Sequence, residues 1–397
     1  MERLRTWSYQ QIKSVPKEFT RTLASSIRWN SRLIVITGAR GVGKTTLMLQ
    51  HIEKNIPLNE EVLYVAADDI FFTNNTLIDL ADDFVKRGGK YLFVDEVHKY
   101  ANWSTEIKSI YDNFKELQIV LSGSSTLEIK KGEADLSRRA IFYHLIGLSF
   151  REYIHFQYEL ELPSFSLNDI ITNSKEISWE ISNKIKPIKM FKEYLNFGYY
   201  PFFKEDKETY HKRIAQILSL ILEVDIPSSF SIDYSAVAQI RKLIGLIAPM
   251  VPFKPNITKL SQQIGLSRET FIRYLQYLNK TDVLNLLYSQ TKGVSSLNKP
   301  EKVYLHNPNL AFAIADHNIN VGNLRETFFF NQVGTLHSIT YPSLGDFFVD
   351  DKYTFEVGGK SKTMKQIEGI KNSYIASDEI EISVGEKIPL WLFGFLY

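Results

Sequence analysis

Short apolar runs alternate with segments of helical periodicity over the first 150 residues. The β-branched run at residues 33–37 has the composition of a buried parallel strand, and similar runs lie within residues 61–69, 91–94 and 117–125. Between them, residues 46–55 and 102–114 carry apolar side chains at helical spacing. This alternation predicts an α/β fold, in which helices joined by right-handed crossovers sandwich a parallel sheet.

The pattern becomes mainly helical after residue 150. Helical periodicity covers residues 149–157 and 178–197, and an amphipathic pattern at residues 236–248 stops before a proline. The next segment predicts helix, turn and helix, with Thr258 as the first N-cap, Gly265 at the turn and Ser267 as the second N-cap. The run "VLNLLYSQ" that follows is the expected first strand of a wing. We therefore expect a helical linker or lid region at 151–235 and a winged helix-turn-helix at 236–300, after a first domain at 1–150.

The remaining residues, 301–397, predict a small α/β domain. Glu326 lies in a helical pattern, Asp346 opens one predicted strand and Glu356 lies in the next. The closing run "IPLWLFGFLY" is so apolar that we expect it to be buried as the last strand of this domain's sheet.

Composition narrows the class of protein. The chain has no cysteine, which excludes a disulfide scaffold and a thiolate metal site. Its first residues lack the apolar core of a signal peptide, and no run approaches the length of a membrane span. We expect a cytoplasmic protein with no membrane partner.

The segment "GARGVGKTT" joins the first predicted strand to the first predicted helix. It matches G-x-x-x-x-G-K-[ST], whose glycines let backbone N–H groups surround an anion at a helix N-terminus. Lys44 would reach the β- and γ-phosphates, and the Thr45 hydroxyl would bind Mg²⁺. The sequence thus predicts a site for ATP and Mg²⁺ made by Gly38, Ala39, Arg40, Gly41, Val42, Gly43, Lys44, Thr45 and Thr46.

Two acids, Asp95 and Glu96, close the predicted strand at residues 91–94. Asp95 would hold Mg²⁺ through water, and Glu96 would polarise the water that attacks the γ-phosphate. The serines Ser122 and Ser124 end a neighbouring strand and are candidates for sensing that phosphate, with a simple Gly-Ser turn as the alternative.

Two adjacent arginines, Arg138 and Arg139, follow the last strands of this predicted sheet. Either could act as an arginine finger on transition-state charge, in cis or from a neighbouring subunit of a homo-oligomer. The alternative is an ordinary pair of surface arginines.

The motifs "GARGVGKTT", "LFVDEVHK", "IVLSGSS" and "DLSRRAIFYHLIGLSFREY" together resemble the prokaryotic AAA-type P-loop ATPases that carry a winged helix and a nuclease-like tail of unknown function. The segment "FKEYLNFGYYPFF" is similar to the linker of that family. The resemblance implies that Lys44 and Thr45 contact phosphate and Mg²⁺, that Asp95 and Glu96 are the metal-site acid and the catalytic glutamate, and that Ser124 is the sensor. Arg139 matches the arginine of the family's usual Gly-Arg pair. Because Arg138 replaces the glycine here, the resemblance leaves open which arginine acts.

Positive charge is concentrated in the predicted winged helix-turn-helix. From Val237 to Pro300, nine lysines and arginines stand against two acids. In a helix-turn-helix the second helix enters the major groove, so Arg268 and Arg273 are candidate nucleic-acid contacts, together with Glu269, Tyr274 and Gln276. The alternative is a packing module that binds no DNA.

The tail resembles the restriction-endonuclease-like fold, and this resemblance gives Asp346, Glu356 and a lysine as the metal-dependent triad, with Glu326 as a helical helper. That family has Glu-x-Lys, whereas here Gly358 stands at the lysine position and Lys360 is the first lysine after it. A bulge at the glycines could deliver Lys360 to the site; otherwise the site is a degenerate remnant.

These observations favour a Mg²⁺-dependent ATPase that acts as a nucleotide switch coupled to DNA binding. Two alternatives remain open from the sequence. One is an active Mg²⁺-dependent DNA nuclease regulated by ATP, and the other is a nucleotide-dependent protein-interaction switch without nucleic acid.

Overall fold

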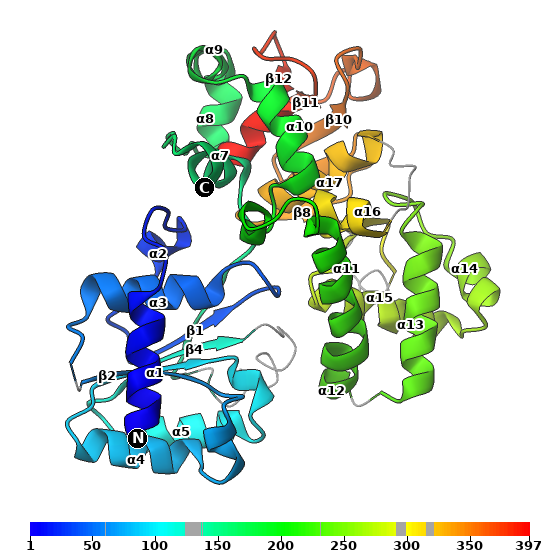
Figure 1. Ribbon diagram of the computed structural model, residues 1–397. Coiled ribbons are helices and arrows are strands. Elements are labelled where there is room, and N and C mark those ends of the chain that lie inside the picture. The colour runs from blue at the N-terminus through cyan, green and yellow to red at the C-terminus, as the bar shows by residue number, and fades with distance from the viewer. Residues whose placement is uncertain (60, 124–135, 137, 231, 291–298, 315–320) are drawn as a thin grey trace. The chain divides into compact units, whose positions relative to one another are not determined.

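The chain divides into two compact units, Met1–Gly147 and Leu148–Tyr397 (Figure 1). The computed structural model describes residues 1–397 except 60, 124–135, 137, 231, 291–298 and 315–320. The finer division of the second unit at residues 235 and 300 stays a prediction.

The N-terminal unit is built on five parallel strands in the order β2-β3-β4-β1-β5. This sheet, flanked by helices, confirms the predicted P-loop α/β fold. Its strands are β1 (Leu33–Thr37), β2 (Val62–Ala66), β3 (Tyr91–Asp95), β4 (Gln118–Gly123) and β5 (Ile141–His144). Its helices are α1 (Glu2–Lys13), α2 (Leu23–Ser26), α3 (Lys44–Asn55), α4 (Leu77–Lys86) and α5 (Trp103–Asn113).

Helices cover both faces of this sheet. Side chains that alternate along the strands, such as Leu63 and Leu92, share one core cluster with Phe84 of α4 and Ile107 of α5. Figure 1 shows α3 on the opposite face, where it packs against β4. Helix α1 lies along the edge strand β2, and the Ser8 hydroxyl accepts a hydrogen bond from a backbone N–H of that strand at 3.0 Å. The exposed edge is thereby closed to pairing with another chain.

The strand order places the ends of three strands side by side. Strand β4 lies between β1 and β3, and its Ser122 is opposite Ile36 of β1. On its other side, Leu121 is opposite Val94, the residue before Asp95. The carboxyl ends of these strands therefore meet at one edge of the sheet, which is where α/β proteins bind ligands.

The C-terminal unit contains a mixed five-stranded sheet in the order β12-β11-β10-β9-β8. Strands β10, β11 and β12 are parallel, whereas β9 is antiparallel to both of its neighbours. The strands are β8 (Ile339–Thr340), β9 (Phe347–Val349), β10 (Tyr353–Gly358), β11 (Ser373–Ser377) and β12 (Lys387–Pro389). The described helices outside the helix-turn-helix are α7 (Phe150–Tyr158), α8 (Leu167–Thr172), α9 (Ser174–Lys184), α10 (Pro187–Phe197), α11 (Tyr210–Leu220), α12 (Ile226–Phe230), α16 (Pro308–Ile314) and α17 (Val321–Val333).

An aromatic cluster joins the start of this unit to its end. Phe150 of α7 lies against Phe191 of α10 and against Phe395, and Phe191 also lies against Phe328 of α17. The carbonyl of Tyr397 accepts hydrogen bonds from two side chains at the start of α7. The first helices of the unit and the last residues of the chain therefore share one core, although the helix-turn-helix lies between them in sequence.

The predicted last strand is wrong beyond Pro389. The chain turns there into a 3-10 helix, Leu390–Phe395, whose side chains are buried. Within this turn Trp391 lies against Phe395, four residues on, and Phe393 lies against Phe329 of α17. In the described part of the chain, no helix is both long and apolar enough to cross a membrane.

The basic segment folds as helix, turn, helix and hairpin. It consists of α13 (Tyr234–Ile247), α14 (Ile257–Ile264), α15 (Arg268–Lys280) and the antiparallel strands β6 (Leu284–Leu287) and β7 (Lys302–Leu305). Gly265 takes a left-handed conformation at the turn, and Ser267 caps α15, as predicted. Thr258 is not the first N-cap, because Asn256 accepts the capping hydrogen bond from the backbone of Lys259 at 3.1 Å. The helix thus begins earlier than expected.

Candidate functional site

The loop between β1 and α3 has the backbone that the glycine motif predicts. Gly38, Gly41 and Gly43 have positive φ angles of 148°, 80° and 100°. A β-carbon at Gly38 would lie 2.0 Å from the carbonyl oxygen of Leu145, so this position accepts only glycine without a backbone shift. Helix α3 begins at Lys44 rather than at Thr46, which brings its first N–H groups to the loop.

The side chain of Lys44 contacts the backbone of this loop. Its side chain is buried, and the ammonium donates hydrogen bonds to the carbonyls of Gly38 and Ala39, both at 2.9 Å. Lys44 thus holds together the first two residues of the loop.

A buried arginine joins the same loop to the end of the unit. Arg21, 6% exposed, donates to the carbonyl of Val42 in the loop at 2.8 Å. The same guanidinium donates to the carbonyls of Ile146 and Gly147 at 2.8 and 2.9 Å. Arg21 thus ties the phosphate-binding loop to the last residues before the second unit.

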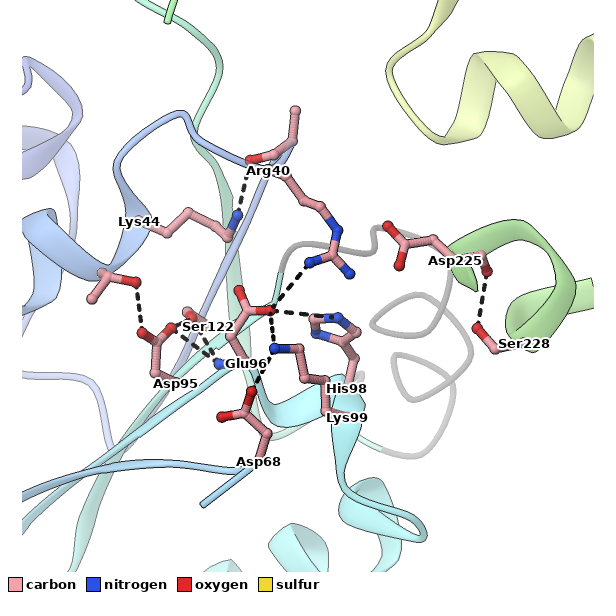
Figure 2. Close-up of polar contacts among 12 residues, drawn as sticks. Arg40, Lys44, Asp68, Asp95, Glu96, His98, Lys99, Ser122, Asp225 and Ser228 are labelled. Atoms are coloured by element: carbon pink, nitrogen blue, oxygen red, sulfur yellow. Dashed lines mark hydrogen bonds and ion pairs between the residues drawn. The ribbon is translucent and has the colours of Figure 1, made fainter. Parts of the chain in front are cut away.

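Asp95 lies at the centre of a hydrogen-bond network at the strand ends (Figure 2). The Thr45 hydroxyl donates to its Oδ2 at 2.6 Å, and the Ser122 hydroxyl donates to Oδ1. The backbone N–H of Glu96 also donates to Oδ1, at 3.0 Å. The hydroxyl of Thr45 and the carboxylate of Asp95 are oxygen ligands of the kind Mg²⁺ prefers, so the residues present fit that ion.

Sequence reasoning missed Tyr64 in this network. Its hydroxyl donates to Asp95 Oδ2 at 2.8 Å from the neighbouring strand β2. Burial, and then the charge of Asp95, raises the pKa of Tyr64, so the phenol remains a hydrogen-bond donor. The sequence signal was weak, because Tyr64 lies in mid-strand and reaches Asp95 only through the pairing of β2 with β3.

Glu96 is held beside three cationic or titratable side chains (Figure 2). Its Oε2 lies 3.4 Å from the ammonium of Lys99, 3.8 Å from His98 Nε2 and 4.0 Å from the guanidinium of Arg40. Burial opposes the charge of Lys99, but the hydrogen bond from Lys99 to Asp68 and the charge of Glu96 outweigh it and raise the pKa of Lys99. Glu96 itself has a left-handed backbone, with φ of 51°. Such a conformation is uncommon for glutamate and occurs frequently at active sites.

Of the two predicted sensor serines, Ser122 lies in the Asp95 network, and Ser124 lies outside the described residues. Of the two arginines, Arg139 is paired with Asp112 of α5 through two hydrogen bonds of 3.0 and 2.9 Å. This bidentate pairing lowers the pKa of Asp112 and raises that of Arg139. Arg138 is exposed.

Residues 30–154 match a family model described as an AAA domain. These residues thus combine the P-loop α/β fold with similarity to AAA domains. The match covers the sheet from β1 to β5 and the whole Asp95 network, and we call the unit Met1–Gly147 the AAA domain. Residues 188–320 match a second model, described as a domain of unknown function (DUF8612).

Known proteins are similar to this chain at low identity. An uncharacterized protein of Methanocaldococcus jannaschii is 26% identical over 285 residues, which cover 68% of this chain and 60% of that relative's length. Among solved structures, the Walker-type ATPase PABY2304 of Pyrococcus abyssi is similar with a TM-score of 0.44 and 10% identity, over 77% of this chain and 99% of that one. AMPPCP-bound DnaA from Aquifex aeolicus is similar with a TM-score of 0.26 and 15% identity, over 70% of this chain and 88% of that one.

Outside the AAA domain, a basic cavity opens at the start of the helix-turn-helix. Its volume is about 350 Å³, and it is lined by Lys254, Pro255, Asn256, Ile257, Thr258, Arg268 and Lys299. The cavity thus brings three cationic side chains to the N-terminus of α14, where backbone N–H groups add positive potential. Of the predicted contacts on α15, Arg268 and Arg273 are exposed. Tyr274 is buried and donates to Gln239 of α13 at 3.1 Å, so it packs the helices together.

The predicted carboxylates of the tail come together in the C-terminal unit, but lysines accompany them. Glu326 lies on α17, Asp346 directly precedes β9 and Glu356 lies on β10. Lys302 of β7 contacts both Glu326 and Asp346, at 2.5 and 3.5 Å. Burial opposes the charge of Lys302, but these two acids outweigh it and raise its pKa.

The lysine expected at Lys360 is instead Lys362. Lys360 is exposed, whereas the ammonium of Lys362 lies 2.5 Å from Glu356 Oε1. A β-carbon at Gly358 would lie 2.8 to 3.0 Å from the side-chain carbons of Lys362. The stem of Lys362 therefore fills the space over Gly358, the position where the resemblance expects the lysine.

Proposed function

We propose that the AAA domain is a Mg²⁺-dependent ATPase. The observation that carries this proposal is the hydrogen bond of 2.6 Å between the Thr45 hydroxyl and Asp95, because it joins the metal-binding residues of two separate motifs in one place. Lys44, buried in the loop beside them, would contact the β- and γ-phosphates. Bound Mg²⁺, held by Thr45 and through water by Asp95, would neutralise charge on the transferred phosphoryl group.

The side chains around Asp95 and Glu96 would have separate roles in the reaction. Thr45, Tyr64 and Ser122 donate to Asp95 and so hold its carboxylate in one orientation. Glu96 would accept a proton from the attacking water. A γ-phosphate next to Arg40 would compete with Glu96 for that arginine and release Glu96 toward the water.

Replacement of Lys44 tests the site. We expect Lys44→Ala to abolish ATP hydrolysis, measured as phosphate release, and to lower ATP affinity. Lys54→Ala, at the exposed far end of the same helix, is the matched control and should keep full turnover. A Lys44→Ala protein that still hydrolyses ATP would refute the assignment.

We further propose Arg138 as the arginine finger, because Asp112 already holds Arg139 through two hydrogen bonds. The finger would act in a neighbouring subunit of a homo-oligomer, and ATP turnover per subunit should then rise with protein concentration. Arg138→Ala should remove most of the turnover, whereas Arg139→Ala should mainly lower the melting temperature. The reverse result would assign the finger to Arg139.

The second half of the proposal is nucleic-acid binding by the helix-turn-helix, as a winged helix. It is supported by the cavity at the N-terminus of α14, because three cationic side chains around backbone N–H groups suit a phosphate of DNA. We expect Lys254→Ala and Arg268→Ala each to weaken DNA binding and to reduce the salt dependence by roughly one released counterion. Lys242→Ala, an exposed lysine of α13 outside the cavity, should change neither.

Nucleotide state would control this DNA contact in the proposed cycle. The test compares proteolysis patterns and DNA affinity of the ATP and ADP forms at two salt concentrations. Identical patterns and affinities would refute the coupling. Turnover that DNA leaves unchanged, with no salt-sensitive DNA binding, would favour a protein-interaction switch instead.

A further inference from the structure

The carboxylate cluster of the tail is formed by Glu326, Asp346 and Glu356. Asp346 is fixed at the edge of β10, because its N–H donates to the carbonyl of Phe355 at 2.9 Å and its Oδ2 accepts from the N–H of Val357 at 2.9 Å. Glu356 lies between these two residues in sequence and is 3% exposed. The nuclease resemblance would place a divalent metal ion among these carboxylates.

Lys302 occupies the position that such an ion requires. Its ammonium lies 2.5 Å from Glu326 Oε2 and 3.5 Å from Asp346 Oδ1, and its side chain is 13% exposed. Divalent ions bind carboxylate oxygens at about 2.0 to 2.6 Å, so an ion bridging these two residues would coincide with the ammonium. The residues present therefore do not fit the metal ion while Lys302 stays in place.

Two further side chains contact the cluster. The Tyr304 hydroxyl donates to Glu326 Oε2 at 3.0 Å, and Lys362 is paired with Glu356. Two ammonium groups thus offset three carboxylates, which leaves less negative charge than a divalent ion needs as compensation for its lost water. Across the described ranges of the chain, no group of three histidine, cysteine or carboxylate residues is arranged to hold a metal.

We propose that Lys302 is a built-in replacement for the metal ion, so that the native tail binds no divalent cation at this cluster and does not cleave DNA. The lysine comes from β7, the second strand of the hairpin after the helix-turn-helix, as does Tyr304. The cluster therefore fastens this hairpin to the tail. Gln290, which follows β6, reinforces the attachment by donating to Asp351 at 2.6 Å.

Removal of the lysine should uncover a cation site. The experiment titrates the nucleotide-free full chain with Mn²⁺ and counts bound ions by electron paramagnetic resonance. We expect Lys302→Met to bind one more Mn²⁺ than the native protein, with an affinity at least tenfold higher than that of the native cluster. The double variant Lys302→Met with Asp346→Asn should lose this additional ion. Any ion at the Thr45 site is common to all variants and cancels in the comparison.

Native protein provides the second measurement, which does not depend on the folding of Lys302→Met. The native chain and the Asp346→Asn variant should bind Mn²⁺ equally. Supercoiled plasmid incubated with the native chain should stay intact in the presence of Mg²⁺ or Mn²⁺. The proposal is overturned if Asp346→Asn removes a native Mn²⁺ site or if folded Lys302→Met gains none. Nicking that Glu356→Ala abolishes would overturn it too, and would establish the nuclease.

Discussion

Glu96 combines an uncommon backbone conformation with a surrounding of cations. The left-handed conformation costs a non-glycine residue on the order of 1 kcal/mol, which the hydrogen bond from its N–H to Asp95 offsets. The turn directs the side chain away from the carboxylate of the preceding residue, so that two adjacent acids can perform different tasks.

We expect Glu96→Gln to lower the rate of ATP hydrolysis by about 100-fold or more while ATP binding persists, because glutamine keeps the shape of glutamate but cannot accept the proton of water. Phosphate release and nucleotide binding by fluorescence measure the two effects separately. Glu159→Gln is the matched control, since Glu159 is an exposed glutamate with a similar φ of 57°. Equal turnover in both variants would show that Glu96 is not the base.

His51 of α3 makes the stability of the fold depend on pH. It stacks on Trp29 with ring centroids 3.6 Å apart, and burial lowers its pKa from 6.5 to about 4. Because the folded chain disfavours the charged form, the stability from neutral His51 is complete above about pH 6.5 and is lost as the pH falls toward 4.

The loss should be on the order of 2 kcal/mol, reduced by partial exposure of the ring to solvent. Chemical denaturation at pH 7 and pH 4.5 measures it. His51→Gln, which cannot titrate, should show a smaller decrease between the two pH values. An unchanged decrease would mean that other groups cause it.

At the scale of elements, the pairing order of the strands creates the nucleotide site. The sequence predicted the strands, the loop and the acid pair, because each depends on a local pattern. It did not predict Tyr64 or Arg21, since their roles arise from contacts with distant segments. The pairing of Lys362 with Glu356 was not predicted for the same reason, because the turn after Gly358 cannot be read from residue spacing.

Gly38, in the loop between β1 and α3, is a position where the effect of a contact with a distant segment can be measured. Gly38→Ala should destabilise the fold by more than about 2 kcal/mol and abolish nucleotide binding, because the new β-carbon would meet the carbonyl of Leu145. Gly88→Ala is the control: its φ is also positive, at 87°, but no described atom lies within 4 Å of the added carbon. Its cost should be only roughly 1 kcal/mol. Similar melting temperatures for both variants would contradict this contact.

At the scale of the whole molecule, both ends of the C-terminal unit contribute to one aromatic core. The aromatic cluster of Phe150, Phe191, Phe328 and Phe395 draws on both ends of that unit. Sequence reasoning could not predict this cluster, because a core shared by separated segments leaves no local signal.

Truncation should reveal this organisation. A chain ending at Gly147 should unfold cooperatively with heat, because its core cluster uses its own residues. A chain ending at residue 300 should expose Phe150 and Phe191, bind hydrophobic dyes and aggregate. Circular dichroism and dye fluorescence compare the two. A well-folded, soluble 1–300 fragment would show that the aromatic cluster is dispensable.

Arg21 connects the glycine loop to the point where the chain leaves the AAA domain. Its rigid, permanently charged guanidinium donates hydrogen bonds both to the glycine loop and to the residues at which the AAA domain ends. A movement of the glycine loop would therefore either move the last residues of the AAA domain with it or break a buried hydrogen bond from the charged Arg21.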